Sequence, residues 1–560
     1  MEIDHPWFRF YDEGVPKNIE AVNDKLNLYE HLSSACARYP NHIALNFLGT
    51  EISYAELLYL IDIFTANLVS VVGIKRKDNI AILLPNCPEF IISFFAAQKI
   101  GAIAVPINPL IPDEDLVKIL NQSKAKLVIT LTKFGPRMIS LANQIKTKKF
   151  VLAYFGEFLP WFKKFIFNLF IAKRDGHMIS NNFSPPNVCF DFSALLRDPE
   201  NTESYADLGI KDSSANDLAV LQYTSGTTGD PKGVMLSSQN IFSDFLQTKS
   251  WMVNFKDSEE VMLAVLPFFH VYGLTVIMIM GLLSGSQLII LPQFKLKDVL
   301  KSIAKNKVSI LHAVPVIYRK IGESKLSKRT DFSSLKICIS GAAPLPRDIK
   351  EQFEKVAKVK LAEGYGLSEA SPVTHVNPLQ SGGRAGSIGL PIPSTEAKIL
   401  DIDDIEKELK PNEIGRLAIK GPQIMQGYFE NPEETNKILR NGWLLTNDVA
   451  YMDNDGFFCV IDRLDDMINV GGEKVWPAEV EKVLKNNPAI QDVMVRGEDD
   501  PKIGQTVKAF VVVKRGMNLT PEELISFCAK YLPKHETPTK IEFRDELPRS
   551  IIGKALKKNL

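Results

Sequence analysis

Small hydroxyl residues and glycines surround a single lysine in the stretch Tyr223-Thr224-Ser225-Gly226-Thr227-Thr228-Gly229-Asp230-Pro231-Lys232-Gly233-Val234. Loops of this composition expose backbone N–H groups and hydroxyl donors, and their small side chains allow close approach to a polyphosphate. Lys232 adds a compact positive charge that suits terminal phosphates. Apolar runs at residues 218–223 and 234–236 flank the loop, so we expect a ligand loop inside a core and not a linker.

The loop does not follow the P-loop pattern. A G-x-x-x-x-G-K-[ST] motif that begins at Gly226 requires glycine at position 231 and serine or threonine at position 233. The sequence has Pro231 and Gly233 instead. We therefore expect a phosphate-binding loop of another design.

Length and composition limit the class of protein. A chain of 560 residues is too long for one hydrophobic core, so two or more domains are expected. Equal numbers of basic and acidic residues, 66 of each, give no support for nucleic-acid binding. Six dispersed cysteines without a C-x-x-C pair indicate free thiols in a reducing compartment. The first residues lack the pattern of a secretory signal, and a cytoplasmic protein is expected.

Helix-like and strand-like segments alternate over residues 1–130. A capping-box pattern at Ser53 opens an apolar-periodic helix. The strand-like run 79–84 precedes a helix-like run 88–100 with Pro88 in its first turn, and the runs 102–106 and 126–130 are again strand-like. This alternation predicts an α/β fold with parallel sheets covered by helices.

The region 261–294 contains no Asp, Glu, Lys or Arg. Prolines and glycines divide it into a strand (261–266), a turn, a buried helix (272–284) and a second strand (287–291), so we reject a membrane span. The turn brings aromatic residues and His270 to the end of a strand, where α/β proteins bind ligands. A single histidine in such a place is usually structural, but its position after a phosphate loop favours a pocket.

Two further loops follow short apolar runs. Gly341, Ala342 and Ala343 are small enough for a flat ring to approach the backbone, and Tyr365 offers a stacking face. Glu369 supplies a carboxylate that could help to hold Mg²⁺ beside substrate phosphates. Taken alone, Glu369 would be interpreted as an exposed residue at a helix start.

An aromatic segment runs from Phe158 to Phe170 and ends in Lys173-Arg174. Leu159, Phe162, Phe165, Ile166, Leu169 and Phe170 share one helical face, and Phe167 breaks the pattern. We favour a helix that packs on its own domain; the alternative is an interfacial helix that rests on a membrane. The segment cannot span a bilayer, because Lys163 and Lys164 interrupt a run already shorter than the roughly 20 residues required.

A short charged run at residues 461–466 resembles a hinge. After it comes a tail of about 95 residues, within the usual range of domain sizes. The tail is expected to form a helix (477–485), two strands (490–496 and 506–514), a helix (521–532) and a last strand (540–543). Near its end stands Lys554, which alone carries little information.

Together these motifs resemble the adenylate-forming superfamily of acyl-CoA synthetases, luciferases and peptide-synthetase adenylation domains. The resemblance covers almost the whole chain. A match to one motif would be weak evidence, whereas matches to many motifs in the same order are specific. In chain order the motifs are the loop 224–232, the turn 267–273, and residues 341–344, 365–369, 386–391, 421–428, 446–448, 462–466, 471–472 and 553–554. The opening run His5-Pro6-Trp7 and the aromatic insertion are similar to those of long-chain fatty-acid–CoA ligases.

The resemblance implies a large N-terminal domain, residues 1–464, of helix-covered sheets with a β-barrel-like subdomain. A small mobile α+β domain, residues 465–560, would follow. The implied reaction uses ATP, Mg²⁺ and CoA in two steps: a fatty acid is activated as acyl-adenylate with release of pyrophosphate, and the acyl group then passes to CoA with release of AMP.

The resemblance also implies roles for single residues. The β- and γ-phosphates would lie against Thr224, Ser225, Gly226, Thr227, Thr228, Gly229 and Lys232. The nucleotide would bind at Gly341, Ala342, Ala343, Gly364, Tyr365, Gly366, Ser368, Asp448 and Arg463. Glu369 would hold Mg²⁺, Asp465 would be the hinge, and Lys554 would bridge the substrate carboxylate and the α-phosphate, so that Thr224, Glu369 and Lys554 form the catalytic set. CoA would pass Gly471 and Gly472, and the acyl group would lie against His270, Val271, Gly273 and Leu274.

Four positions depart from the family pattern: Ser368, Asn447, Ser238 and Ile552. The substrate stays open between a fatty acid and an aryl acid, and the acceptor between CoA and a carrier protein. No carrier domain follows Lys554, so a peptide-synthetase module is not expected. A non-catalytic scaffold would have lost Glu369, Asp448 or Lys554, and all three are present. A homodimer, and a peripheral membrane contact at the inner face of the membrane, are left open.

Overall fold

The computed structural model describes residues 5–20, 25–177, 188–197, 214–224, 230–549, 557 and 560. Within these residues, no helix is both long enough and apolar enough to cross a membrane. All six cysteines are free, as their spacing predicts. The uncharged region 261–294 forms a strand, a helix and a second strand, which confirms the interpretation as a buried βαβ segment.

An eight-stranded sheet carries the phosphate loop. Its central strands pair in parallel, and an antiparallel β8–β9 hairpin and β19 form one edge. The strand order is β19 (Gly427–Tyr428), β9 (Lys232–Ser237), β8 (Leu218–Thr224), β4 (Ile103–Pro106), β3 (Asn79–Leu83), β5 (Leu127–Leu131), β6 (Lys149–Ala153) and β7 (Val188–Asp191).

A nine-stranded sheet carries the other ligand loops. It is parallel from β14 to β1 and ends in antiparallel strands on both sides. The order is β16 (Leu390–Pro391), β15 (Val373–Val376), β14 (Leu361–Gly366), β13 (Ile337–Ser340), β12 (Ile310–Ala313), β10 (Val261–Ala264), β11 (Gln287–Ile290), β1 (Ile43–Phe47) and β2 (Thr50–Ser53).

Helices cover both sheets, as the alternation predicts. Ser53 caps α2 with a complete capping box, and Pro88 starts α3, which is buried along its whole length. The helices of this part are η1 (Pro6–Phe10), α1 (Leu28–Arg38), α2 (Tyr54–Ser70), α3 (Pro88–Ile100), α4 (Asp113–Gln122), η2 (Thr132–Phe134), α5 (Gly135–Leu141), α6 (Trp161–Ile166), η3 (Phe167–Ile171), η4 (Ala194–Leu196), α7 (Ser238–Trp251), η7 (Tyr272–Ile279), α8 (Met280–Leu283), α9 (Leu296–Asn306), α10 (Pro315–Glu323), η8 (Ser327–Arg329), α11 (Arg347–Ala357) and η9 (Ser368–Ala370).

The third sheet of the large domain is antiparallel and corresponds to the barrel-like subdomain that the resemblance implies. It contains β17 (Glu396–Leu400), β18 (Gly415–Lys420), β20 (Leu439–Arg440), β21 (Trp443–Met452) and β22 (Phe458–Arg463), and α12 (Pro432–Ile438) lies beside it. Strand β21 is its centre, because β18, β20 and β22 all pair with it.

The C-terminal domain is a small α+β unit, as predicted. It begins after η10 (Leu464–Asp466) and has β23 (Ile468–Val470), β24 (Glu473–Val475), α13 (Pro477–Lys485), β25 (Ile490–Asp500), β26 (Gly504–Val513), α14 (Pro521–Cys528) and β27 (Lys540–Phe543). Helix α14 is shorter than predicted, because the N–H groups of Tyr531 and Leu532 both turn back to the carbonyl of Cys528 ahead of Pro533. The boundary between residues 464 and 465 remains a prediction.

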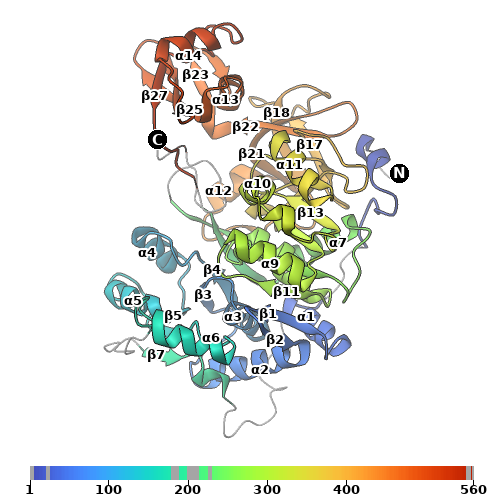
Figure 1. Cartoon of the computed structure of the whole chain (residues 1–560), viewed down its shortest axis with the longest axis vertical. Helices are drawn as coiled ribbons and strands as arrows, with labels where there is room; N and C mark the ends of the chain where they lie inside the picture. The colour runs from blue at the N-terminus through green and yellow to red at the C-terminus, as the bar shows by residue number, and fades with distance from the viewer. Residues whose placement is uncertain are drawn as a thin grey trace.

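The aromatic segment is helical, but the favoured prediction that its apolar face packs on its own domain is wrong for five of the six residues of that face; Leu159 alone is buried. Six large apolar side chains of α6 and η3 are between 47% and 83% exposed: Trp161, Phe162, Phe165, Ile166, Leu169 and Phe170. Phe167, which breaks the predicted pattern, is the residue that is buried. In Figure 1, α6 and α2 lie toward one end of the long axis and the C-terminal domain lies at the other.

Candidate functional site

The β8–β9 hairpin positions the two described ends of the phosphate loop. Thr224 is the last residue of β8 and pairs with Lys232, the first residue of β9. Glycine is favoured at position 233, because a Cβ there would lie 3.1 Å from the Tyr223 ring. The loop residues Ser225, Gly226, Thr227, Thr228 and Gly229 lie outside the described residues.

Lys232 is held by an ion pair that nothing in the sequence singles out. Its Nζ lies 2.5 Å from Oε2 of Glu434 in α12, and 5.4 Å from the centroid of the Tyr428 ring. The hydrogen bond from Lys232, with a second one from Lys437, lowers the pKa of the Glu434 carboxyl to about 2. The Lys232 amine, a compact cation that suits phosphates, is therefore already in place, and the Glu434 carboxylate neutralises its charge.

Glu369 lies on the other side of the same tyrosine. It belongs to η9, and its Oε1 accepts a hydrogen bond of 2.8 Å from the Tyr428 hydroxyl. Burial, followed by the charge of Glu369, raises the pKa of Tyr428, so the tyrosine stays a hydrogen-bond donor. Tyr428 thus connects the predicted phosphate cation with the predicted metal ligand, although the motif 427–428 had no assigned role.

Neighbouring parallel strands bring the predicted nucleotide loops together. Ser340 at the end of β13 pairs with Glu363 in β14, so Gly341 and Gly364 follow at the same sheet edge. A Cβ on Gly341 would lie 2.9 Å from the Tyr272 ring, and one on Gly366 would lie 2.2 Å from the carbonyl oxygen of Pro372. Ala342 has a φ of +66°, and Ala343 follows it in the same turn. Contact with the protein's own atoms accounts for glycine at positions 341 and 366, and the approach of a flat ring remains a prediction.

Tyr365, Asp448 and Arg463 form a compact polar group. The Tyr365 hydroxyl donates to Asp448 over 2.5 Å, and Arg463 lies 3.7 Å from the same carboxylate, because β21 and β22 pair Asp448 with Arg463. Asn447 lies in β21 with ordinary strand backbone, so this departure needs no tolerance of unusual angles. Ser368 opens η9 directly before Glu369.

Two buried amides, absent from the sequence predictions, fasten the turn of His270 to the phosphate strand β8 and to the segment between β3 and α3. Gln222 of β8 donates to the carbonyl of Phe269 over 3.0 Å. Asn86 donates to the carbonyl of Leu266 over 2.8 Å and accepts from the N–H of Phe268 over 2.8 Å. A polar residue inside an apolar run, as Asn86 is, could have signalled such a link, because buried amides need partners.

The predicted acyl-pocket residues surround the start of η7. A Cβ on Gly273 would lie 2.2 Å from the carbonyl oxygen of Pro267, which requires glycine there, and Val271 and Leu274 are buried. Burial lowers the pKa of His270 to about 4, so its imidazole is neutral at pH 7. A cavity of about 180 Å³, with Phe242, Phe245 and Leu283 among its lining residues, lies at the far end of the same helical segment.

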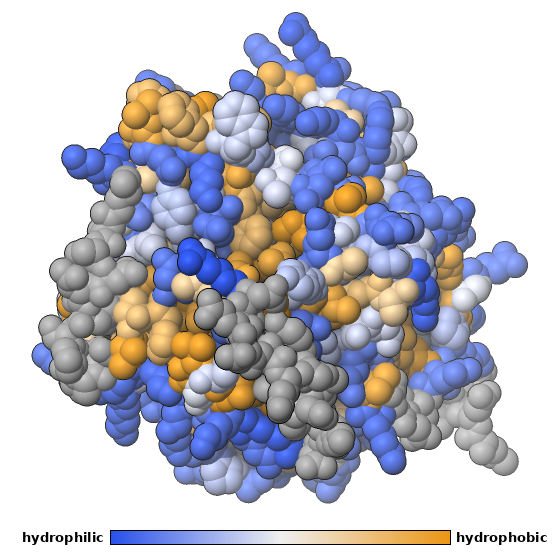
Figure 2. Space-filling view, turned by 90° about the horizontal axis from the view of Figure 1, so that it is seen from below, coloured by the Kyte–Doolittle hydropathy of each residue, from blue (hydrophilic) through white to orange (hydrophobic). Residues whose placement is uncertain are grey.

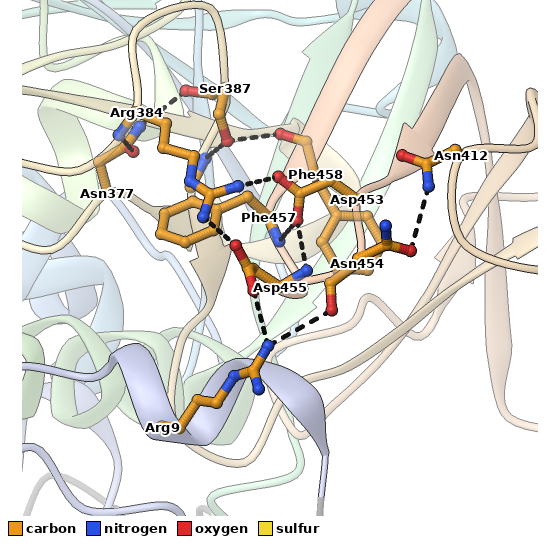
Figure 3. Close-up of polar contacts among 11 residues, drawn as sticks. Arg9, Asn377, Arg384, Ser387, Asn412, Asp453, Asn454, Asp455, Phe457 and Phe458 are labelled. Carbon is orange, nitrogen blue, oxygen red and sulfur yellow. Dashed lines mark hydrogen bonds and ion pairs between the residues drawn. The ribbon is translucent and has the colours of Figure 1, made fainter.

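An arginine clasp steadies the hairpin that carries Asp448 (Figure 3). Arg384 binds Asp453 and Asp455 and lies 4.3 Å from the centroid of the Phe457 ring. Arg9 of η1 joins from the N-terminal segment, 2.6 Å from Asp455. The turn between β21 and β22 is thus fixed by residues from two distant parts of the chain.

The C-terminal residues lie apart from this group. Gly471 and Gly472 form the exposed turn of the β23–β24 hairpin, with φ of +63° and +97°, which explains glycine there without a ligand. Asp465 lies in η10, directly after β22. Lys554 and Ile552 lie outside the described residues.

Two family models match the chain. The AMP-binding enzyme model matches residues 32–429, and the model of the AMP-binding enzyme C-terminal domain matches residues 479–554. The first match contains Lys232, Glu369 and Tyr428, and the second covers most of the C-terminal domain.

Relatives and solved structures agree with these models. The chain is 38% identical over 560 residues to a long-chain-fatty-acid–CoA ligase of Bacillus subtilis (strain 168), covering 100% of this chain and 98% of the relative. It is 34% identical over 559 residues to the ligase of the same name from Salmonella typhimurium, covering 99% and 97%. The structure superposes with a TM-score of 0.76 at 26% identity on the O-succinylbenzoate coenzyme A synthetase of Bacillus subtilis in complex with ATP and magnesium ion, covering 96% and 100%. The chain belongs to the AMP-binding enzyme family.

Proposed function

We propose that the chain is an ATP-dependent acyl-CoA ligase that activates a long-chain fatty acid. The observation that carries the proposal is the junction at Tyr428, where Lys232 and Glu369 meet beside the group of Tyr365, Asp448 and Arg463. The full-length similarity to two long-chain-fatty-acid–CoA ligases supports the substrate class.

In the first step, the fatty-acid carboxylate attacks the α-phosphate of ATP, and the bond to pyrophosphate breaks. Two anions must meet, so the barrier is largely electrostatic and the protein needs positioned cations and donors. Lys232, Lys554 and the loop residues Thr224 to Gly229 would supply them. In this step Lys232 would exchange Glu434 for a phosphate.

Glu369 fits the expected Mg²⁺. Its carboxylate is half-buried and accepts a hydrogen bond from Tyr428, whose ring Lys232 also contacts. Among the described residues there is no group of three or more His, Cys, Asp or Glu side chains that could hold a metal. Mg²⁺ often takes few protein ligands beside substrate phosphates, and when bound it would neutralise charge on the leaving pyrophosphate.

The nucleotide would lie across the edge of the nine-stranded sheet. The adenine ring would lie against Tyr365, beside the small residues Gly341, Ala342, Ala343, Gly364 and Gly366. Asp448 would accept hydrogen bonds from the ribose hydroxyls, with Arg463 beside it, and Ser368 would donate to a phosphate. The Tyr365–Asp448 hydrogen bond would keep the carboxylate oriented.

In the second step, the CoA thiol attacks the acyl carbonyl, and AMP leaves while the thiol proton is released. Lys554 and the pair Gly471-Gly472 belong to one small domain but would serve different steps. We therefore expect the domain to rotate about Asp465 between them. The ion pair of 2.7 Å between Lys474 and Asp403 links the domain to the large one and would break during rotation.

The acyl chain would lie along η7, against His270, Val271, Gly273 and Leu274. Each buried methylene contributes about 0.8 kcal/mol, so ten would supply about 8 kcal/mol before ordering costs. An aryl acid is the second candidate, because the chain is also 34% identical over 498 residues to 4-coumarate–CoA ligase 2 of Solanum tuberosum. We place the enzyme in the cytoplasm, with a peripheral membrane contact through the helical segment α6–η3.

Release of pyrophosphate with a panel of carboxylates, with and without CoA, tests the reaction. Release that requires a fatty acid, with AMP and thioester formed when CoA is present, is the expected result. Lys554→Ala should block adenylation and spare thioester formation from preformed acyl-adenylate. Equal loss of both half-reactions would refute the role of Lys554, and preference for an aryl acid would select the second candidate.

The hinge has its own test. Asp465→Pro should keep adenylation and lose thioester formation, because proline restricts the backbone change that rotation needs. Asp465→Ala is the matched control and should retain both half-reactions. Full turnover by the proline variant would contradict the hinge assignment.

A further inference from the structure

The exposed apolar surface of α6 and η3 is a surface feature that the ligase chemistry does not use. We define the aromatic patch as Trp161, Phe162, Phe165, Ile166, Leu169 and Phe170. All six exceed 45% exposure, and at a helical spacing of 100° per residue they occupy one half of the helix circumference. Side chains scattered singly over a surface need no explanation, but a contiguous patch of this kind marks an interaction site.

The helix is firmly seated on the protein through its other half. Phe167 is 7% exposed, with ring centroids 5.6 Å from Phe155 and 5.3 Å from His177. Lys163 donates to the carbonyl of Leu48 over 2.5 Å, and Tyr154 and Asn168 share a hydrogen bond. The aromatic patch is therefore presented outward by a fixed helix.

Basic residues flank the patch along the chain. The segment 157–175 has four basic residues, Lys163, Lys164, Lys173 and Arg174, against two acidic ones, Glu157 and Asp175. Lys164 pairs with Glu157 over 3.5 Å and Arg174 with Asp175 over 2.9 Å, which leaves Lys163 and Lys173 in excess.

Helix α9 adds to this basic rim. Its exposed Lys301 and Lys305 are near enough to Lys163 to lower the pKa of that amine, after the larger effect of burial, and Asp298 is the acidic group that opposes them. The rim therefore has a positive excess contributed by two elements. Figure 2 views the molecule from below, the end near which α6 lies in Figure 1, and shows orange patches directly beside blue side chains.

We propose that the aromatic patch with its basic rim docks the enzyme on a bilayer that contains anionic phospholipid. Aromatic side chains favour the level of the headgroups, lysine stems lie along apolar surface while their amines reach phosphates, and the positive excess matches an anionic leaflet. A second copy of the chain would gain nothing from a rim of like charge around the same patch. The proposal deepens the proposed function, because a fatty acid partitions into such a bilayer.

Orientation fits this docking. The aromatic patch lies toward the end of the molecule that is opposite the C-terminal domain (Figure 1). A docked enzyme would keep that domain in water, where CoA and ATP are dissolved.

Vesicle sedimentation tests the proposal on the whole chain without substrates. A failure to bind vesicles would therefore leave the proposed ligase function intact, and a failure of the ligase assay would leave the proposed membrane docking intact. We expect binding to vesicles of phosphatidylcholine with phosphatidylglycerol, weak binding to phosphatidylcholine alone, and weakening between about 0.1 and about 1 M salt, where the screening length falls from about 10 to about 3 Å. Equal binding to both vesicles at all salt concentrations would overturn the role of the basic rim.

Matched variants locate the surface. Phe165→Ser with Phe170→Ser should reduce vesicle binding at least tenfold, roughly the effect of losing two interfacial aromatics. Leu110→Ser with Leu326→Ser removes apolar side chains of 68% and 52% exposure elsewhere and should leave binding unchanged. Equal binding by the two pairs, or no binding by the wild type, would overturn the proposal.

Trp161 gives an independent readout. Among the five tryptophans it is the exposed one, at 83%, so its emission should shift to the blue on anionic vesicles and the shift should vanish in Trp161→Phe. Light scattering without vesicles tests whether a second copy of the chain covers the patch instead. The wild type could form a dimer that the Phe165→Ser, Phe170→Ser variant does not form, and fail to bind vesicles. That result would assign the patch to a second copy of the chain and would overturn the proposal of membrane docking.

Discussion

Two apolar helical segments of this protein have opposite fates. Residues 272–283, in η7 and α8, are almost entirely buried, whereas six of the large apolar side chains of residues 161–170, in α6 and η3, face outward. The first segment has no charged residue, and the second has Lys163 and Lys164 in its first turns. At 100° per residue, Lys163 and Lys164 lie on the half of the helix that carries the buried Phe167, and the Lys163 amine has its partner there in the carbonyl of Leu48.

The difference also concerns how each segment is held. The buried one is enclosed on all sides, by strands β10 and β11 and by helices α1 and α7. The exposed one is held on the protein through one half only, by Phe167 and by polar contacts of Lys163 and Asn168. Side-chain truncation in the buried segment should therefore lower the stability of the fold, whereas truncation in the exposed segment should weaken binding to a partner surface.

Matched leucines give the largest contrast. Leu274→Ala should lower the free energy of unfolding by about 4 kcal/mol, because it leaves a cavity in a closed core. Leu169→Ala, on the aromatic patch, should change it by less than about 0.5 kcal/mol. Urea unfolding followed by circular dichroism measures both, and similar losses in the two variants would erase the distinction.

Neighbouring phenylalanines sharpen the same contrast within one helix. Phe167→Ala should cost about 3 kcal/mol, since Phe167 anchors the helix against Phe155 and His177. Phe165→Ala should leave stability unchanged within about 0.5 kcal/mol while weakening vesicle binding. Hydrogen exchange of residues 161–171 checks the assignment: faster exchange in the first variant only is expected, and equal exchange would deny the anchor.

Proton linkage beside the buried segment should give the smallest effect. The folded pKa of His270, about 4, lies below its unfolded value of 6.5, so its contribution is complete above pH 6.5 and is lost as the pH falls toward 4. From pH 7.5 to pH 5, the wild type should lose on the order of 2 kcal/mol in free energy of unfolding through His270, and the His270→Gln variant should not show this loss. Exposed His42→Gln should retain the wild-type loss in the same urea titrations. An unchanged pH dependence in His270→Gln would mean that water reaches this imidazole.

Much of the fold follows from local signals. The capping box at Ser53, Pro88 in a first turn and the uncharged βαβ region are local patterns, and the structure confirms each of them. The direction of the aromatic face does not follow in this way. Periodicity identifies a face but not whether a partner covers it, and the residue that breaks the period, Phe167, is the anchor.

The candidate site also combines residues that the sequence predicts with residues that only the structure reveals. Lys232, Glu369, Tyr365 and Asp448 belong to motifs that can be found in the sequence, and the structure brings them into two connected groups. Their partners cannot be found in this way: Glu434 is 202 positions from Lys232, and Asn86 and Gln222 meet the His270 turn only through the pairing of distant strands. Roles for Lys554, Asp465 and residues 471–472 remain predictions.

The arginine clasp of Figure 3 bears on how this chain can be shortened. Residues 5–20 are fastened at several points: Arg9 to Asp455, Trp7 against Gly456, and Asp12 to the N–H groups of Gln380 and Ser381. Removing them would uncover the turn below Asp448 and leave Arg384 to hold two aspartates alone. A truncated enzyme should therefore begin before His5, and a purification tag placed there needs a flexible spacer so that Trp7 can reach its seat.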